Sequence, residues 1–90
     1  MRPNLHIKMS YDDLTDVMHL SYAHGIPTKS LEDEAGLVLR YDYKTHKFVG
    51  VTIFDYKNYW YSRHRHLVRR LSNYFNISPD EVESIINLAN

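Results

Sequence analysis

The sequence predicts an α+β fold, in which a small, mainly antiparallel β-sheet of four or five strands is followed by a C-terminal helical hairpin packed on one face. Three observations predict it. Residues 1–57 hold short segments of alternating apolar and polar side chains between closely spaced turn signals. Residues 59–75 repeat apolar side chains at helical spacing. A chain of 90 residues forms one core. We therefore expect a single domain over residues 1–90, with a β-meander over 1–57 and two helices over 58–90.

The overall composition excludes several classes of protein. Eleven Lys and Arg residues balance eleven Asp and Glu residues, so the formal net charge is zero. With 43% apolar residues and no net charge, the chain is unlike a disordered one. Because cysteine is absent, disulfide frameworks and cysteine-based zinc sites are excluded. The sequence shows neither an apolar run near the ~18 residues of a membrane span nor a signal-peptide pattern. We therefore expect a soluble, cytoplasmic protein.

The first two strands are expected on either side of a turn. A short strand over residues 6–9 is followed by a turn-like segment over 10–15, where Ser and Asp side chains can satisfy nearby backbone groups. Residues 16–22 alternate apolar and polar side chains, which is typical of a strand. Residues 24–27 contain Gly and Pro and break the pattern.

Three further strands are expected before residue 57. Residues 29–34 form a polar edge strand, and a turn leads into the strand over 37–42. After a hairpin connection over 44–47, residues 48–56 have the strongest strand composition, rich in β-branched and aromatic side chains. Gly50 inside this segment indicates a bulge or a close backbone approach. The short spacing between turns favours antiparallel pairing in a meander.

The last third of the chain predicts two helices. Over residues 59–75, apolar side chains fall on one arc and basic ones on the other. The second helix has a clear start, since Ser78 is a preferred N-cap and Pro79 suits the first helical position. Glu81 completes a capping box with Ser78. We therefore expect the second helix to begin at Pro79.

Five short motifs between residues 10 and 55 resemble the YuzE-like family of small bacterial domains of unknown function. They are Tyr11-Asp12, Asp16-Val17-Met18-His19-Leu20, Glu32-Asp33-Glu34, Leu37-Val38-Leu39-Arg40-Tyr41-Asp42 and Val49-Gly50-Val51-Thr52-Ile53. Thr52 stands where the family usually has Glu, and the helical segment after residue 57 lies outside the pattern. The resemblance implies a compact antiparallel sheet with helix packing and no established activity. Some relatives look like partners in toxin–antitoxin-type gene pairs, which implies protein binding.

The basic face of the first helix is a candidate nucleic-acid interface. Its cationic side chains could bind phosphates, and neighbouring aromatic rings could stack on bases. The candidate residues are Arg63, Arg65, His66, Arg69 and Arg70. The ordinary alternative is the solvated face of an amphipathic helix. A helix-turn-helix is disfavoured because the second helix opens with Asp80, Glu81 and Glu83, which would repel phosphate.

Metal and catalytic sites have weaker signals. His64 and His66 are two residues apart on a helix, so their side chains point in different directions. His6 and His19 could face each other on neighbouring strands, but the spacing implies no third ligand. We therefore expect no metal site and no cofactor. A small hydrolase-type enzyme using the region of Asp12 and Asp16 with a histidine is a second alternative. Asp residues at turns more simply cap backbone groups. We therefore expect no catalytic residue and no enzyme activity.

The two faces of the predicted sheet both carry apolar side chains. In the strand over 48–56, Val49, Val51 and Ile53 point one way and Phe48, Phe54 and Tyr56 the other. A half-exposed sheet should have one polar face, and this one does not. We therefore expect a second copy of the chain to cover the apolar face that the helices leave open. The expected interface residues are Val38, Phe48, Phe54 and Tyr56. Tyrosine side chains of the same chain could cover the face instead.

Together these observations predict a non-catalytic interaction or regulatory module that forms homo-oligomers, with antitoxin-like protein binding. Nucleic-acid binding through the basic helix face is the first alternative, and the hydrolase is the second.

Overall fold

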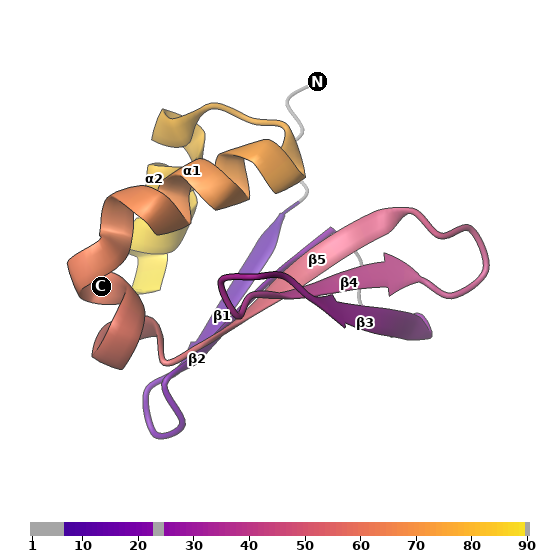
Figure 1. Cartoon of the computed structure of the whole chain (residues 1–90), viewed down its shortest axis with the longest axis horizontal. Coiled ribbons are helices and arrows are strands. Elements are labelled where there is room, and N and C mark those ends of the chain that lie inside the picture. The colour runs from indigo at the N-terminus through magenta and orange to yellow at the C-terminus, as the bar shows by residue number, and fades with distance from the viewer. Residues whose placement is uncertain (1–6, 23–24, 90) are drawn as a thin grey trace.

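The computed structural model describes residues 7–22 and 25–89, where helices lie on one face of a five-stranded antiparallel sheet (Figure 1). This confirms the predicted fold class. The strands are β1 (Lys8–Asp12), β2 (Val17–Ser21), β3 (Thr28–Glu32), β4 (Val38–Asp42) and β5 (Phe48–Phe54). The helical segments are the π-helical turn η2 (Tyr56–Trp60), the 3-10 turns η3 (Tyr61–Arg63) and η4 (Asn87–Ala89), and the helices α1 (His64–Phe75) and α2 (Pro79–Ile86). No helix in these described ranges is long and apolar enough to cross a membrane.

The order of the strands differs from a meander. The sheet runs β1-β2-β5-β4-β3, so β5 lies in the centre and the connection after β2 leads to the far edge. The predicted meander over residues 1–57 is therefore wrong, although every neighbouring pair is antiparallel. Five of the seven residues of β5 are buried. The segment with the strongest strand composition thus takes the position with neighbours on both sides, while the polar strand β3 lies at an edge as predicted.

The first strand is longer than expected at its C-terminal end. Ser10, Tyr11 and Asp12 belong to β1 and pair with β2, so the predicted turn over 10–15 is wrong for these three residues. Cross-strand pairing and an edge-to-face contact of Tyr11 with Tyr56, at 5.5 Å between ring centroids, outweigh the local turn preference. Residues 6 and 24, also part of the sequence predictions, lie outside the described residues.

The helix-covered face of the sheet contains the hydrophobic core. The strands β2, β4 and β5 contribute Met18, Leu20, Leu39, Val51 and Ile53. The helices contribute Leu67, Val68, Leu71, Phe75, Val82, Ile85 and Ile86. The apolar arc of the predicted first helix therefore packs on the sheet. At the start of α2, the backbone N–H of Glu81 donates to Ser78 Oγ and the N–H of Ser78 donates to Glu81 Oε1, which confirms the capping box.

The first helix begins later than predicted. Residues 59–63 are not α-helical, because they belong to the π-helical turn η2 and the 3-10 turn η3. Tyr56 and Trp60, at the two ends of the π-helical turn, are both buried in the core. Asp55 enters the turn in a left-handed conformation, with φ of 56°. Tertiary packing of two large rings therefore overrides the helical periodicity here.

A β-bulge changes which side chains of β5 face the helices. The register pairs Arg40 with Gly50 but Tyr41 with Phe48, so Val49 is an extra residue in β5. As a result Phe48 packs on Phe75 of α1, with ring centroids 5.0 Å apart. Tyr56, after the strand, is 0% exposed in the core. The prediction that Phe48, Phe54 and Tyr56 share a face is therefore wrong.

The uncovered face of the sheet, here called the open face, is mainly polar. The register places Ser10, His19, Thr52, Val38 and Glu32 in one row across the five strands. The next row holds Lys8, Ser21, Gly50, Arg40 and Ser30. The expectation of two apolar faces is therefore wrong, and the open face has the polar character of a solvated sheet surface.

Gly50 allows β2 and β5 to approach closely, as its position in the strand predicted. A Cβ atom at Gly50 would lie 2.5 Å from the carbonyl oxygen of Leu20 and 3.1 Å from Ser21 Cα. These are backbone atoms, so the central strand pair would have to separate.

We expect Gly50→Ala to lower the free energy of unfolding by at least about 2 kcal/mol through this clash, measured by urea denaturation. The matched control is Gly25→Ala, where nothing lies within 4 Å of the added Cβ and only the positive φ of 73° opposes it. That control should cost about 1 kcal/mol. Equal losses for the two variants would contradict the close approach at Gly50.

Candidate functional site

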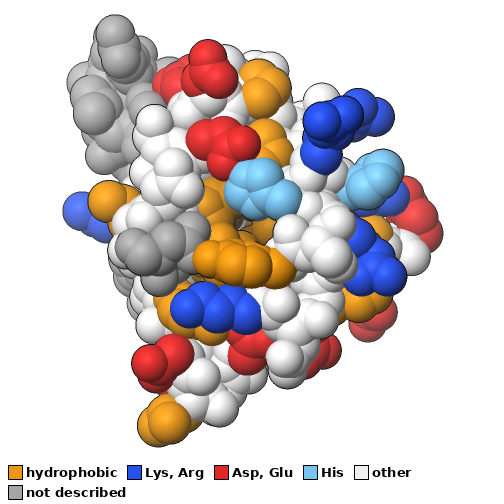
Figure 2. Space-filling model, turned by 90° about the vertical axis from the view of Figure 1, so that its left-hand side faces the viewer, with side chains coloured by type: hydrophobic (Ala, Val, Ile, Leu, Met, Phe, Trp, Pro, Cys, Tyr) orange, Lys and Arg blue, Asp and Glu red, His pale blue; other side chains and the backbone are white. Residues whose placement is uncertain are grey.

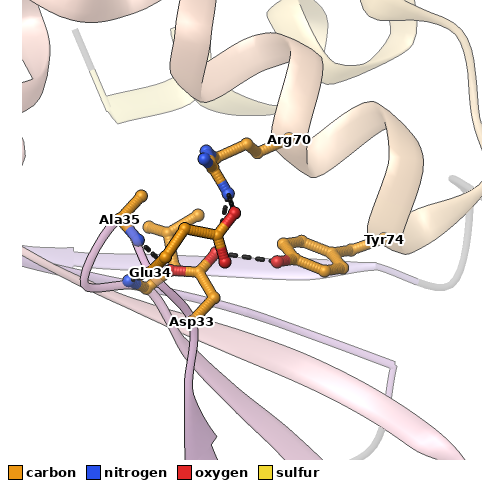
Figure 3. A network of polar contacts seen from close by, with 6 residues as sticks. Asp33, Glu34, Ala35, Arg70 and Tyr74 are labelled. Carbon is orange, nitrogen blue, oxygen red and sulfur yellow. Dashed lines mark hydrogen bonds and ion pairs between the residues drawn. The ribbon is translucent and has the colours of Figure 1, made fainter.

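The structure divides the five predicted nucleic-acid-binding residues into two groups. Arg70 points toward the turn between β3 and β4 (Figure 3). Its Nη1 atom lies 3.2 Å from Asp33 Oδ2 and 3.1 Å from Glu34 Oε1. Arg63 folds back on its own turn, where Nη1 donates to the carbonyl oxygen of Tyr59 and the guanidinium lies 3.9 Å from the Tyr59 ring centroid. The guanidinium groups of Arg63 and Arg70 are therefore both engaged in contacts within the chain.

Asp33 is the centre of the contact between the sheet and α1. Its side chain is 5% exposed. Oδ1 accepts from the backbone N–H groups of Ala35 and Leu37, both at 2.9 Å, and Oδ2 accepts from the Tyr74 hydroxyl at 2.7 Å. With Arg70, the carboxylate thus receives four hydrogen bonds. It joins the β3–β4 turn to the C-terminal half of α1 (Figure 3).

These contacts shift the ionisation of both side chains. Burial alone would raise the pKa of Asp33, but the hydrogen bonds from Tyr74, Leu37 and Ala35 and the charge of Arg70 outweigh it and lower this pKa. Burial, followed by the hydrogen bond to Asp33, raises the pKa of Tyr74 to about 12. The carboxylate is therefore held ionised and the phenol neutral at neutral pH.

Arg65, His66 and Arg69 form the second group. All three are exposed on α1. No hydrogen bond or ion pair engages their side chains within residues 7–22 and 25–89. The two guanidinium charges and the ring nitrogens of His66 are thus available to a partner.

Arg65 and Arg69 line a groove of about 560 Å³ between α1 and α2, here called the helix groove. Its other lining residues are His64, Val68, Ser72, Asn73, Pro79 and Glu83. His64 Nε2 lies 2.6 Å from Glu83 Oε1 and links the two helices. Arg65 and Arg69 are four residues apart, so they project from the same side of α1. The helix groove therefore combines two unpaired guanidinium groups with an apolar patch at Val68 and Pro79.

The surface charge around the helical layer is mixed. Figure 2 shows acidic, basic and histidine side chains interspersed around a hollow bordered by hydrophobic side chains. Glu83 lies within the helix groove, and the carboxylates of Asp33 and Glu34 neutralise Arg70. The predicted basic face is therefore interrupted by carboxylates from α2 and from the sheet.

The carboxylates of Asp12 and Asp16, the residues predicted for the hydrolase alternative, accept hydrogen bonds from backbone N–H groups. Asp16 Oδ1 accepts from the N–H of Lys57 at 2.8 Å and Oδ2 from the N–H of Asn58 at 3.0 Å. The Tyr11 hydroxyl also donates to Asp16, at 2.7 Å. Asp12 Oδ1 accepts from the backbone N–H of Leu14. Asp16 thus caps the start of the helical layer from the turn between β1 and β2.

The ionisation of Asp16 agrees with this capping role. Burial alone would raise its pKa, but the hydrogen bonds from Lys57, Asn58 and Tyr11 outweigh it and lower the pKa. A general acid needs a pKa raised toward neutrality. Asp16 is shifted in the opposite direction.

The described residues contain no group of three or more histidine, cysteine, aspartate or glutamate side chains placed to hold a metal ion. His64 pairs with Glu83, and His19 lies on the open face beside Thr52, 3.0 Å from its hydroxyl. His6 lies outside the described residues. The four predicted interface residues do not share one surface either. Val38 and Phe54 lie on the open face, and Phe48 and Tyr56 pack on the helix side.

Comparisons with protein-family models, with curated proteins and with solved structures found no match for this chain. The resemblance to the YuzE-like family stays a prediction. The function must therefore be inferred from the geometry of the chain itself.

The network at Asp33 predicts an acid-sensitive stability. A carboxyl group whose pKa is lowered in the folded state stabilises the fold above its ordinary value of 3.8, and this contribution is lost as the pH falls through the folded value. We expect Asp33→Asn to lower the free energy of unfolding by about 2 kcal/mol at neutral pH, and the difference from wild type to shrink as the pH falls below about 4.

Urea denaturation at several pH values measures this difference. The matched control is Glu34→Gln, because Glu34 contacts the same Arg70 atom with a side chain that is 79% exposed. It should cost less than about 1 kcal/mol. A pH-independent effect of Asp33→Asn, or an equal effect of the two variants, would show that the network does not anchor α1.

Proposed function

We propose that this protein is a non-catalytic interaction module that binds an acidic segment of a protein partner in the helix groove. The observation that carries the proposal is the pair of exposed guanidinium groups, Arg65 and Arg69, beside the apolar patch of the groove. Arginine pairs with carboxylates through two parallel hydrogen bonds and is enriched at protein interfaces.

The composition of the helix groove suits a peptide segment. Val68 and Pro79 offer apolar contact, while Ser72 and Asn73 offer hydrogen-bonding groups for a backbone. The carboxylate of Glu83 lines the groove and disfavours a partner of uniform negative charge. A segment with a few carboxylates among apolar residues fits this mixture best.

Nucleic-acid binding is supported less well. Arg63 and Arg70 are engaged within the fold, so only Arg65, His66 and Arg69 remain to contact phosphates. Carboxylates interrupt the surface, whereas nucleic-acid interfaces are strongly positive. A hydrolase is also supported less well, because the Asp16 carboxylate already accepts hydrogen bonds from two backbone N–H groups and from the Tyr11 hydroxyl.

A homodimer through the open face is a second candidate, favoured by one small apolar cluster. Val17 of β2 lies opposite Phe54 of β5. On the other side of β5, Val38 of β4 lies opposite Thr52, two residues before Phe54 and on the same face. Phe54 is 50% exposed. This cluster replaces the four-residue interface expected from the sequence, and it is small compared with an obligate dimer interface.

Charge reversal tests the helix groove. Wild type, the double variant Arg65→Glu/Arg69→Glu and a control Lys44→Glu/Lys47→Glu are used to capture proteins from cells that produce this chain, with and without nuclease. We expect one protein partner to be retained by wild type and control, at least about tenfold less by the groove variant, and equally after nuclease. Equal capture by both double variants would overturn the groove, and capture that nuclease abolishes would favour nucleic acid.

Light scattering tests the homodimer candidate. A dimer through the cluster at Phe54 should have twice the 10.7 kDa mass of one chain at high concentration, and Phe54→Lys should restore the monomer because a charge would be buried at the interface. A wild-type monomer over the whole concentration range would remove this candidate.

A further inference from the structure

A second hollow, here called the sheet pocket, lies on the open face, on the side of the sheet opposite the helix groove. Its volume is about 290 Å³, at the lower end of the range for small-molecule sites. It is lined by Ser10, His19, Ser21, Gly25, Ile26, Thr28, Arg40 and Val49. Among the described residues, the lining contains one cation, three hydroxyl groups and no carboxylate.

The irregularities of β5 help to form the sheet pocket. The bulge brings Val49 into the lining instead of the core. Gly50 lies between Ser21 and Arg40 in the register and has no side chain to fill the space between them. Gly25 and Ile26 come from the connection between β2 and β3, so this connection contributes one wall. Bulges that redirect side chains in this way are frequent beside functional sites.

Arg40 makes no ion pair in the described part of the chain. No carboxylate pairs with it there, and its Nε atom is buried without a hydrogen-bond partner. The carboxylate of Asp42, two residues along β4, accepts from the backbone N–H groups of Lys44 and Thr45 and does not line the pocket. A buried donor on a charged group is costly to leave unpaired, so this position fits an anion.

His19 adds polarity to the sheet pocket without adding a second charge. Its Nδ1 atom lies 3.0 Å from the hydroxyl of Thr52. Burial, followed by the charge of Arg40, lowers the pKa of His19 below its ordinary value of 6.5. The ring is therefore neutral at neutral pH, and Arg40 is the one cation among the lining residues that the structure describes.

We propose that the sheet pocket binds a small phosphorylated molecule, with its phosphate group on Arg40 and its remaining polar part along His19 and Ser10. Thr28 lies on β3, the strand paired with β4, and can donate a hydroxyl hydrogen bond to the phosphate beside Arg40. A phosphate has three strong acceptor oxygens, so it can use the guanidinium and the hydroxyl together. Ser21 Oγ already donates to the carbonyl of Val49 and is not needed. The proposal is independent of the helix groove.

Nuclear magnetic resonance can observe the Arg40 Nε–H group directly. Inorganic phosphate is the minimal probe and ribose 5-phosphate the phosphomonoester probe, each titrated at constant ionic strength, with acetate as a carboxylate control. We expect saturable shifts of Arg40 Nε–H and of the Thr28 and Val49 amides with both phosphates. Ribose 5-phosphate should bind at least about tenfold more tightly and also shift the Ser10 and His19 amides, because it reaches further along the pocket.

Three variants separate binding from folding. Arg40→Gln should weaken ribose 5-phosphate binding by at least about tenfold, and Thr28→Val, on an edge strand, by a few-fold. Arg69→Gln, on the other side of the sheet, should have no effect. The proposal is overturned if phosphate produces no saturable shift at Arg40, if acetate binds as tightly, or if folded Thr28→Val and Arg40→Gln both bind like wild type. Equal affinity for the two phosphates would overturn the phosphorylated molecule as ligand.

Discussion

Two carboxylates from turns between strands fix the position of the helical layer on the sheet, at the edges of the hydrophobic core that both layers share. Asp16 accepts hydrogen bonds from N–H groups at the start of the π-helical turn, and Asp33 accepts hydrogen bonds from Arg70 and Tyr74 in the C-terminal half of α1. A 90-residue chain buries a limited hydrophobic core, so its free energy of unfolding is small. The hydrogen bonds that join the two layers are therefore a large fraction of that free energy. Hydrogen bonds lower the pKa of both carboxyl groups and hold them ionised within the fold.

The same anchors determine which charges remain for function. Arg70 forms ion pairs with Asp33 and Glu34, and Arg63 stacks on Tyr59. Arg65 and Arg69 are exposed on the side of α1 that lines the helix groove. On the open face, the bulge of β5 and the absence of a side chain at Gly50 leave Arg40 beside a hollow. The zero net charge of the sequence therefore hides two separate cationic positions, one on each side of the sheet, with different surroundings.

Local signals in the sequence predicted the elements better than their arrangement. The capping box at Ser78 and Glu81 and the apolar arc of α1 depend on neighbouring residues, and both were correct. The central place of β5 and the π-helical turn at Tyr56 depend on contacts between distant segments, such as Asp16 with Lys57. The bulge inverted the expected face of Phe48, since one extra residue reverses the alternation of a strand. For Asp33, the acidic run 32–34 gave no sign that one of its carboxylates is buried and the others exposed.

The arginines of α1 are divided between Arg70, which is paired within the fold, and Arg65 and Arg69, which are exposed. Relaxation of the Nε–H groups by nuclear magnetic resonance measures this division in one experiment, because it reports motion of each guanidinium on the picosecond-to-nanosecond timescale. We expect Arg70 to be as rigid as the backbone of α1, and Arg65 and Arg69 to be mobile until a partner binds. Equal mobility of Arg70 and Arg69 in the free protein would contradict it.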